Sequence, residues 1–228
     1  ISICDTVKGK KHAKKRINLS FEECNVWYHS NGTPVERWSK APCQLEDIYN
    51  FEDALLIGCL LITLLKNADR VKIACLAQLV NVIAPIMTNK EGDVWKQTIF
   101  YPFMQVSNFG RGVVLEPETK SDTYATKDFD AVPFLESIAT YDEHKKEIVI
   151  FAVNRSKNEH LDFSINVEGF EMEEIVETTQ MSGYDVKETN QEKEKVNLSK
   201  GNSIELHTNS LKTELKPLSW NVIRISVK

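Results

Sequence analysis

The feature that most constrains the fold is a change of pattern near Gly112. From there to residue 228, short stretches alternate between apolar and polar residues, with turn-forming or charged stretches between them. Regular short strands without helices are typical of an antiparallel β-sandwich. The predicted strands are 137–141, 147–153, 161–167, 173–177, 203–207 and 219–227. The charged segment 185–202 has few apolar residues, so it is predicted to be a mobile loop.

Residues 1–111 follow another pattern, in which helical and strand-like stretches take turns. A helix is predicted to end within the basic segment 1–16. Apolar residues recur at helical spacing over 46–66 and 94–108, which predicts two further helices. Gly58, in the middle of the first of these, indicates close packing of that helix against a sheet.

Two strands are predicted between these helices. Residues 17–21 alternate, which indicates a strand with one buried face, and 71–82 are almost continuously apolar, as in a strand buried on both faces. This order is the repeating unit of a (β/α)8 TIM barrel, of which a complete copy needs eight strands and about 250 residues. We therefore predict an α/β plus all-β chain. Residues 1–111 would be the C-terminal part of a (β/α)8 barrel, with its last two strands and helices, and 112–228 a C-terminal antiparallel β-sandwich domain.

Composition excludes several classes of function. The chain has 228 residues and a net charge of −5, so nothing global indicates a nucleic-acid or anionic-membrane partner. Its longest apolar run, 54–65, is far below the roughly 18 residues that predict a membrane span. The five cysteines are odd in number and have neither disulfide-framework nor zinc-site spacing, which favours a reducing, cytoplasmic compartment and predicts no metal.

Two carboxylates, Glu22 and Glu23, follow directly on the strand predicted over 17–21. Catalytic groups of barrel enzymes stand at the C-terminal ends of strands, but two adjacent Glu residues are also common as solvated charges in a turn. Gln78 and Asn81, near the end of the other strand, fit either a buried hydrogen-bond bridge or a substrate contact at the mouth of a barrel. Trp38 fits either a lid over a cleft or an anchor on the core.

The stretch around these carboxylates resembles the nucleophile motif of the α-L-arabinofuranosidases of glycoside hydrolase family 51. The resemblance is dense to about Asn154, thinner after that and clear again at the end. The segments that carry it are Leu19–His29, Ala41–Pro42, Leu45–Tyr49, Phe51–Leu55, Ala68–Ala74, Leu76–Ile86, Gln97–Phe103 and Leu218–Arg224.

This resemblance implies roles for individual residues. Glu23 aligns with the nucleophile, Trp27 with an aromatic residue that lines the sugar site, and Gln78 with a residue that hydrogen-bonds the arabinose. Glu22, where the family usually has Asp, and Asn25 are expected to support the nucleophile without touching the sugar.

The chain also departs from the family's pattern. The general acid of the family follows an Asn on an earlier strand, whereas the Asn-Glu pair here, Asn158-Glu159, falls in a turn of the predicted sandwich. The general acid is therefore expected to be absent from this chain. Cys24 stands where Trp is typical, which would leave a void beside the nucleophile, and Cys43 stands where Pro is usual.

The resemblance implies a retaining, exo-acting α-L-arabinofuranosidase that releases terminal arabinofuranosyl groups from arabinan or arabinoxylan oligosaccharides. Such an enzyme works with two carboxyl groups and needs no cofactor. By analogy with the family, a homo-oligomer is a further expectation. The alternative is a truncated, non-catalytic relative that serves only as a folding or assembly module. It is motivated by the missing acid, the missing strands and Cys24.

Overall fold

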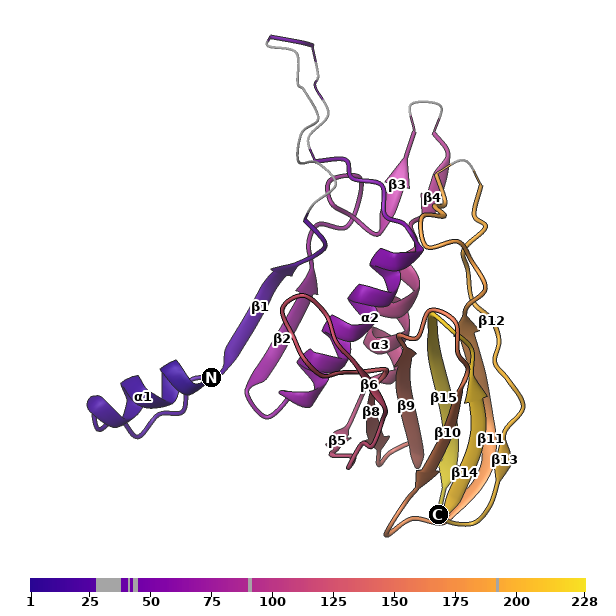
Figure 1. The fold of residues 1–228 in the computed structure, drawn as a ribbon. Helices are drawn as coiled ribbons and strands as arrows, with labels where there is room; N and C mark the ends of the chain where they lie inside the picture. The colour runs from indigo at the N-terminus through magenta and orange to yellow at the C-terminus, as the bar shows by residue number, and fades with distance from the viewer. Residues whose placement is uncertain (28–37, 41, 43–44, 90–91, 192) are drawn as a thin grey trace.

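The computed structural model describes residues 1–27, 38–40, 42, 45–89, 92–191 and 193–228 (Figure 1). Their C-terminal half is dominated by two antiparallel sheets. The larger sheet has the strand order β12-β11-β15-β9-β8-β5 and the smaller one β10-β14-β13. The strands are β5 (Val113–Leu115), β8 (Leu135–Asp142), β9 (Glu147–Asn154), β10 (Leu161–Asn166), β11 (Met172–Met181), β12 (Ser199–Lys200), β13 (Glu205–Leu206), β14 (Ser210–Leu215) and β15 (Ser219–Val227).

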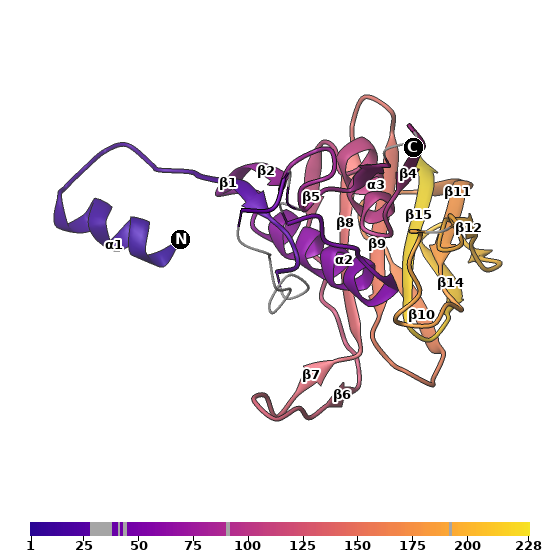
Figure 2. The same cartoon turned by 90° about the horizontal axis from the view of Figure 1, so that it is seen from above.

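These two sheets pack against each other through an apolar cluster that includes Ile150, Phe163, Leu211 and Ile225. The predicted antiparallel sandwich is therefore confirmed. Strand β14, the centre of the smaller sheet, was not predicted because polar and charged residues separate its few apolar positions. A short hairpin of β6 (Thr123–Tyr124) and β7 (Val132–Pro133) projects to one side (Figure 2).

The other face of the six-stranded sheet is covered by helices α2 (Phe51–Lys66) and α3 (Phe100–Phe109) (Figure 2). Strand β9 is buried along its whole length, because Ile150 faces the small sheet while Phe151 faces the helices. The close approach predicted at Gly58 is confirmed, since a Cβ built on it would lie 2.7 Å from Cε3 of Trp220. The helices of the first half and the sandwich thus share one core.

Both helices begin later than predicted. Asn50 caps α2 and forms a capping box with Asp53, so the helix begins at Phe51 and not at residue 46. The helix predicted over 94–108 was wrong in its first part, where β4 (Val94–Lys96) pairs with β3 (Ile86–Thr88). Because α3 begins only at Phe100, Pro102 lies in its first turn, where a proline does not interrupt the helix.

The predicted mobile loop over 185–202 was also wrong. Its backbone carbonyls accept hydrogen bonds from the first amides of α2, from Phe51 to Glu188 and from Glu52 to Val186. Val196 is fully buried in the core, and so is the side chain of Asn190. The buried side chain of Val196 and the fully hydrogen-bonded side chain of Asn190 therefore hold in place a segment whose composition is mostly polar.

Strands β1 (Leu19–Cys24) and β2 (Val71–Leu76) form a separate parallel pair. The first was predicted to be buried on one face and the second on both faces. Instead, Phe21 of β1 is 42% exposed and Ile73 of β2 is 54% exposed. A parallel pair becomes buried only when other strands and helices cover its edges and faces. In the described residues β1 and β2 pair with no other strand, so their apolar side chains remain on the surface.

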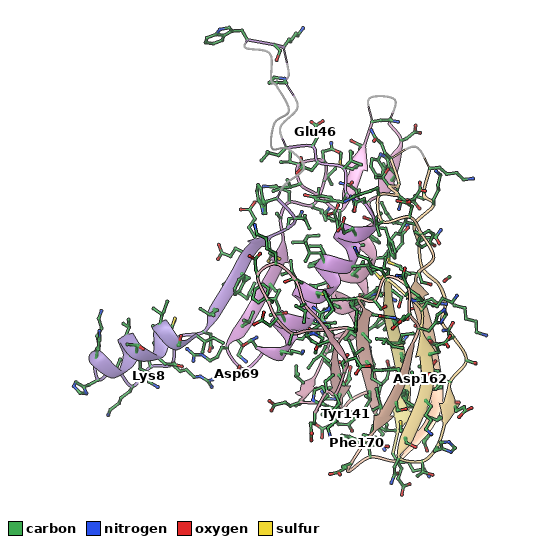
Figure 3. The ribbon with its side chains drawn as sticks, in the orientation of Figure 1. Lys8, Glu46, Asp69, Tyr141, Asp162 and Phe170 are labelled. Atoms are coloured by element: carbon green, nitrogen blue, oxygen red, sulfur yellow. The ribbon has the colours of Figure 1, made fainter. Side chains whose placement is uncertain are left out.

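Helix α1 (Ser2–Lys10) lies apart from the rest (Figures 2 and 3). Arg70 links it to the body. Its guanidinium donates to both carboxylate oxygens of Asp5, at 2.7 and 2.8 Å, and to the carbonyl of Ile17. None of the described helices is both long enough and apolar enough to cross a membrane.

Candidate active site

The C-terminal ends of β1 and β2 lie side by side, and this is where the sequence predicted the site. Cys24 is the register partner of Leu76, and the amide of Ala77 donates to the carbonyl of Cys24 at 3.1 Å. Glu23 and Gln78 each lie one residue from that hydrogen bond, and both side chains are exposed. Residues 55 positions apart in the chain therefore meet at one edge of the parallel pair.

Strand β1 is irregular where the two carboxylates stand. Phe21 pairs with Ala74 and Cys24 with Leu76. The pairing therefore advances by three residues on β1 but by only two residues on β2. A bulge of this kind redirects side chains and is frequent beside active sites. The hydroxyl of Ser20 donates to Glu22 at 3.5 Å, which places the Glu22 side chain along Ser20. That Glu23 occupies the opposite face stays a prediction.

Asn25, expected to support the site, holds a strained loop. Its side-chain amide donates to the carbonyl of Ile83 at 2.6 Å, and the amide of Ile83 donates to Leu45 at 2.8 Å. Ile83 has φ 42°, which is unfavourable for a β-branched residue, and Gln78 and Asn81 also have positive φ, at 49° and 66°. Such strain persists only where the surroundings impose it, and it is concentrated at functional sites.

Gln97 fixes the segments behind this loop, and sequence reasoning missed it. It is fully buried; its Oε1 accepts from the amide of Tyr49, and its Nε2 donates to the carbonyls of Asp47 and Ala84. The sequence feature that could have indicated it is the pair of polar residues Gln97-Thr98 within the stretch predicted to be a helix. Burial, with Asp47 the next cause, raises the pKa of the Tyr49 phenol, so that group stays protonated at neutral pH.

The aromatic candidates differ in what surrounds them. Trp27, just beyond β1, is 48% exposed, as a residue that receives a ligand must be. Trp38 is 99% exposed, which is incompatible with an anchor on the core. Most of the segment around Trp38, from 28 to 44, lies outside the residues that the structure describes, and so does Cys43.

The thiol of Cys24 lies half-buried beside Glu23 and donates to the carbonyl of Cys75 at 3.3 Å. Burial raises the pKa of the Cys24 thiol, and the neighbouring Cys75 raises it further. Cys24 is therefore neutral at physiological pH and puts no negative charge next to the carboxylate.

Asn158 and Glu159 lie between β9 and β10, in the sandwich and not beside β1. This is the turn of the sandwich in which the sequence predicted the pair. Because Glu159 lies in another part of the fold, it is not a partner of Glu23. Among the described residues, no group of three or more His, Cys, Asp or Glu side chains could hold a metal ion.

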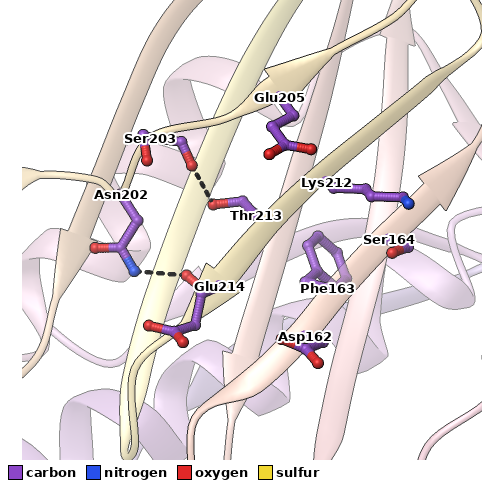
Figure 4. A pocket seen from close by; sticks show the side chains of 9 residues that line it. All are labelled: Asp162, Phe163, Ser164, Asn202, Ser203, Glu205, Lys212, Thr213 and Glu214. Carbon is purple, nitrogen blue, oxygen red and sulfur yellow. Dashed lines mark hydrogen bonds between the residues drawn. The ribbon is translucent and has the colours of Figure 1, made fainter.

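A groove of about 530 Å³ on the outer face of the small sheet is a second candidate (Figure 4). Asp162 and Glu214 are register partners there, but Glu214 is paired with His160 at 2.6 Å. The ring of Phe163 is buried beneath the groove and offers no surface on which a sugar could stack. We therefore place the candidate site at the ends of β1 and β2 and not in this groove.

Comparison with known proteins identifies the family of the chain. The family model that describes the α-L-arabinofuranosidase C-terminal domain matches residues 22–219. The intracellular exo-α-(1→5)-L-arabinofuranosidase of Halalkalibacterium halodurans is 50% identical over 230 residues, which is 100% of this chain and 46% of that protein. A protein of Bacillus subtilis with the same activity in its name is 51% identical, covering 97% of this chain and 45% of its own length.

Solved structures are similar as well. A family 51 α-L-arabinofuranosidase from Bifidobacterium longum superposes with a TM-score of 0.88 at 36% identity, covering 97% of this chain and 44% of that one. An arabinose complex of the Thermotoga maritima enzyme gives a TM-score of 0.76 at 25% identity, covering 98% and 45%. This chain thus spans somewhat less than half the length of the proteins it matches.

Proposed function

Because this chain belongs to the α-L-arabinofuranosidase C-terminal domain family of glycoside hydrolase family 51, we propose that it carries the nucleophile side of an arabinofuranosidase active site. The complete enzyme would be retaining and exo-acting and would release terminal arabinofuranosyl groups from arabinan or arabinoxylan oligosaccharides. The supporting observation is the meeting of Glu23 and Gln78 at the hydrogen bond between Ala77 and Cys24.

In this proposal Glu23 attacks the anomeric carbon and forms a covalent glycosyl intermediate, which water then hydrolyses. The Glu23 side chain is exposed and therefore open to a ligand, and the neutral thiol of Cys24 beside it adds no negative charge. Trp27 would contact the sugar ring, and Gln78 would hydrogen-bond a sugar hydroxyl. Asn25 would act indirectly, by holding the loop at Ile83.

The proton for the leaving group would come from a carboxylic acid outside this chain, about 5–5.5 Å from Glu23 in a retaining enzyme. Residues 1–111 would then be two units of a (β/α)8 barrel whose other strands cover β1 and β2, and residues 112–228 would be the sandwich domain. Arabinose-containing oligosaccharides are the proposed ligands. The cytoplasm is the proposed compartment, since the relatives from Halalkalibacterium halodurans and Bacillus subtilis are both named intracellular. A homo-oligomer remains a proposal by analogy.

The alternative is a non-catalytic folding or assembly module. It is favoured by the exposed faces of β1 and β2 and by Cys24 in place of the family's Trp. An assay of the 228-residue chain alone on an aryl α-L-arabinofuranoside does not distinguish the module from the nucleophile-bearing part of an enzyme. The chain alone should be inactive under both readings. Hydrolysis by it would contradict the expectation that the general acid is absent from this chain, and it would also contradict a non-catalytic module.

A chimera distinguishes the two readings. This whole chain would replace the matched segment of the Halalkalibacterium relative, which supplies the remaining residues. Activity of the chimera is expected, and Glu23→Gly should lower it by roughly three orders of magnitude or more. Added azide should then restore turnover by attacking the anomeric carbon in place of the carboxylate, yielding the glycosyl azide of inverted configuration.

The comparison variant is Glu22→Gln, at the neighbouring carboxylate. Because Glu22 is expected only to support the nucleophile, this variant should lose much less activity than Glu23→Gly, and azide should not raise its activity. If Glu23→Gly remains fully active, or if Glu22→Gln is the inactive variant that azide rescues, the nucleophile is misassigned. A folded chimera without activity would favour the module.

A further inference from the structure

The segment that leaves the sandwich between β11 and β12 reaches strand β4 and the start of α2. We call its described residues, 182–191 and 193–198, the strap. Figure 1 shows it rising beside β4 before it returns to β12. Tyr184 packs edge-on against Phe51 at 5.3 Å, and Val196 is buried in the core shared by the helices and the sheet. The strap is thus fixed to the rigid part of the molecule.

Two strap side chains hold the backbone of Lys96 in β4. Asn190, 1% exposed, donates through Nδ2 to the carbonyl of Lys96 at 3.0 Å, and Glu194 accepts from the amide of Lys96 at 2.9 Å. Burial, and next the charge of Glu194, raises the pKa of the Tyr101 phenol in α3 to about 12. The strap therefore occupies the place of a third strand beside β4, with side chains in place of a backbone ladder.

Strand β4 pairs with β3, and β3 holds the strained loop that carries Gln78. The amide of Asn81 donates to the carbonyl of Ile86 at 2.8 Å. The amide of Thr88 donates to Oδ1 of Asn81 at 2.7 Å, and Nδ2 of Asn81 donates to the Thr88 hydroxyl at 3.0 Å. The side chain of Asn81 is thus a hydrogen-bond bridge to β3, formed near the surface and not in the core.

A path of hydrogen bonds and strand pairing thus runs from the strap through β4 and β3 to Asn81, which lies three residues from Gln78 in the same loop. We propose that Glu194 and Asn190 are positioning residues, which set the conformation of the Gln78 loop from the sandwich domain. This inference rests on the proposed sugar-binding role of Gln78. It gives the sandwich a part in substrate binding and not in folding alone.

The decisive variant is Glu194→Ala in the chimera, because it removes the acceptor for Lys96 and leaves the bonds within the strap in place. We expect KM for an aryl arabinofuranoside to rise about tenfold, as for the loss of one or two hydrogen bonds, with a smaller change in kcat. Glu194→Gln should restore most of the affinity, since its amide oxygen can accept the same bond. Asn190→Ala should act in the same direction but also loosen the strap, because Asn190 bonds Lys195 and Val196 as well.

The matched control is Glu188→Ala. It removes a carboxylate from the same strap, where Glu188 pairs with Lys195 at 2.9 Å, but does not touch Lys96. KM should stay within about twofold of the parent value, since an exposed pair of this kind contributes little.

Hydrogen exchange gives a readout that does not need catalysis. Amides of residues 77–88 should exchange faster in Glu194→Ala than in Glu188→Ala, while α2 stays protected. Unchanged exchange, or faster exchange with an unchanged KM, would overturn the positioning role. An inactive parent chimera would instead count against the proposed function, and the exchange experiment would still test the connection.

Discussion

Replacing Gly58 by Ala tests how closely α2 packs on the sandwich. The added Cβ would lie 2.7 Å from Cε3 and 3.0 Å from Cζ3 of Trp220. The indole has little freedom to retreat, because it is fully buried and stacked on Phe151 at 5.9 Å. Its Nε1 also donates to Gln105 at 2.8 Å.

Two effects of opposite sign decide the result. Ala in a helix interior is favoured over Gly by about 1 kcal/mol. Forcing a methyl group into a packed core costs about 1–3 kcal/mol. Since the ring is held by its stack and its hydrogen bond, the cost should lie in the upper part of that range. We expect a net loss of about 1–2 kcal/mol, which is about 2–8 °C in Tm for a chain of this size.

Urea unfolding followed by circular dichroism and tryptophan fluorescence would measure this loss. The control is Gly9→Ala in α1, where nothing lies within 4 Å of the new Cβ and no stability should be lost. If Gly58→Ala is as stable as the parent, or more stable, the close contact between α2 and Trp220 is refuted.

Three further predictions concern local interactions. Asp53→Ala removes one half of the capping box of α2 and should cost about 1 kcal/mol in urea unfolding. Arg224→Lys should cost about 1–2 kcal/mol in the same assay, because Lys cannot keep both bonds to Glu147, at 2.6 and 3.0 Å. The Arg70 guanidinium lowers the pKa of Asp5, so the docking of α1 should hold at neutral pH and weaken as the pH falls below about 4. Hydrogen exchange of residues 1–10 would follow this loss, and Asp5→Asn should abolish its pH dependence.

Much of the fold could be predicted from local pattern. The strands β8, β9, β10, β11 and β15 coincide with the alternating runs, because side chains of a strand alternate between its faces whatever lies beyond them. The close packing of α2 against the sheet could likewise be predicted from local pattern, because Gly58 lies in the middle of a helix. Strand β14 could not be found, because a strand with few apolar residues is defined by its neighbours and not by its own sequence.

The candidate site was predicted only in part. The sequence by itself determined the residue types, Glu23 after a strand and Gln78 near the end of another, together with the membership of the family. Only the tertiary structure decided that these two strand ends are neighbours, that β1 is bulged at its carboxylates, and that Asn190 reaches Lys96 from 94 positions away. The physical reason is that hydrogen bonds between distant segments depend on where the packed core places them, and a sequence pattern records only which face of its own element each residue occupies.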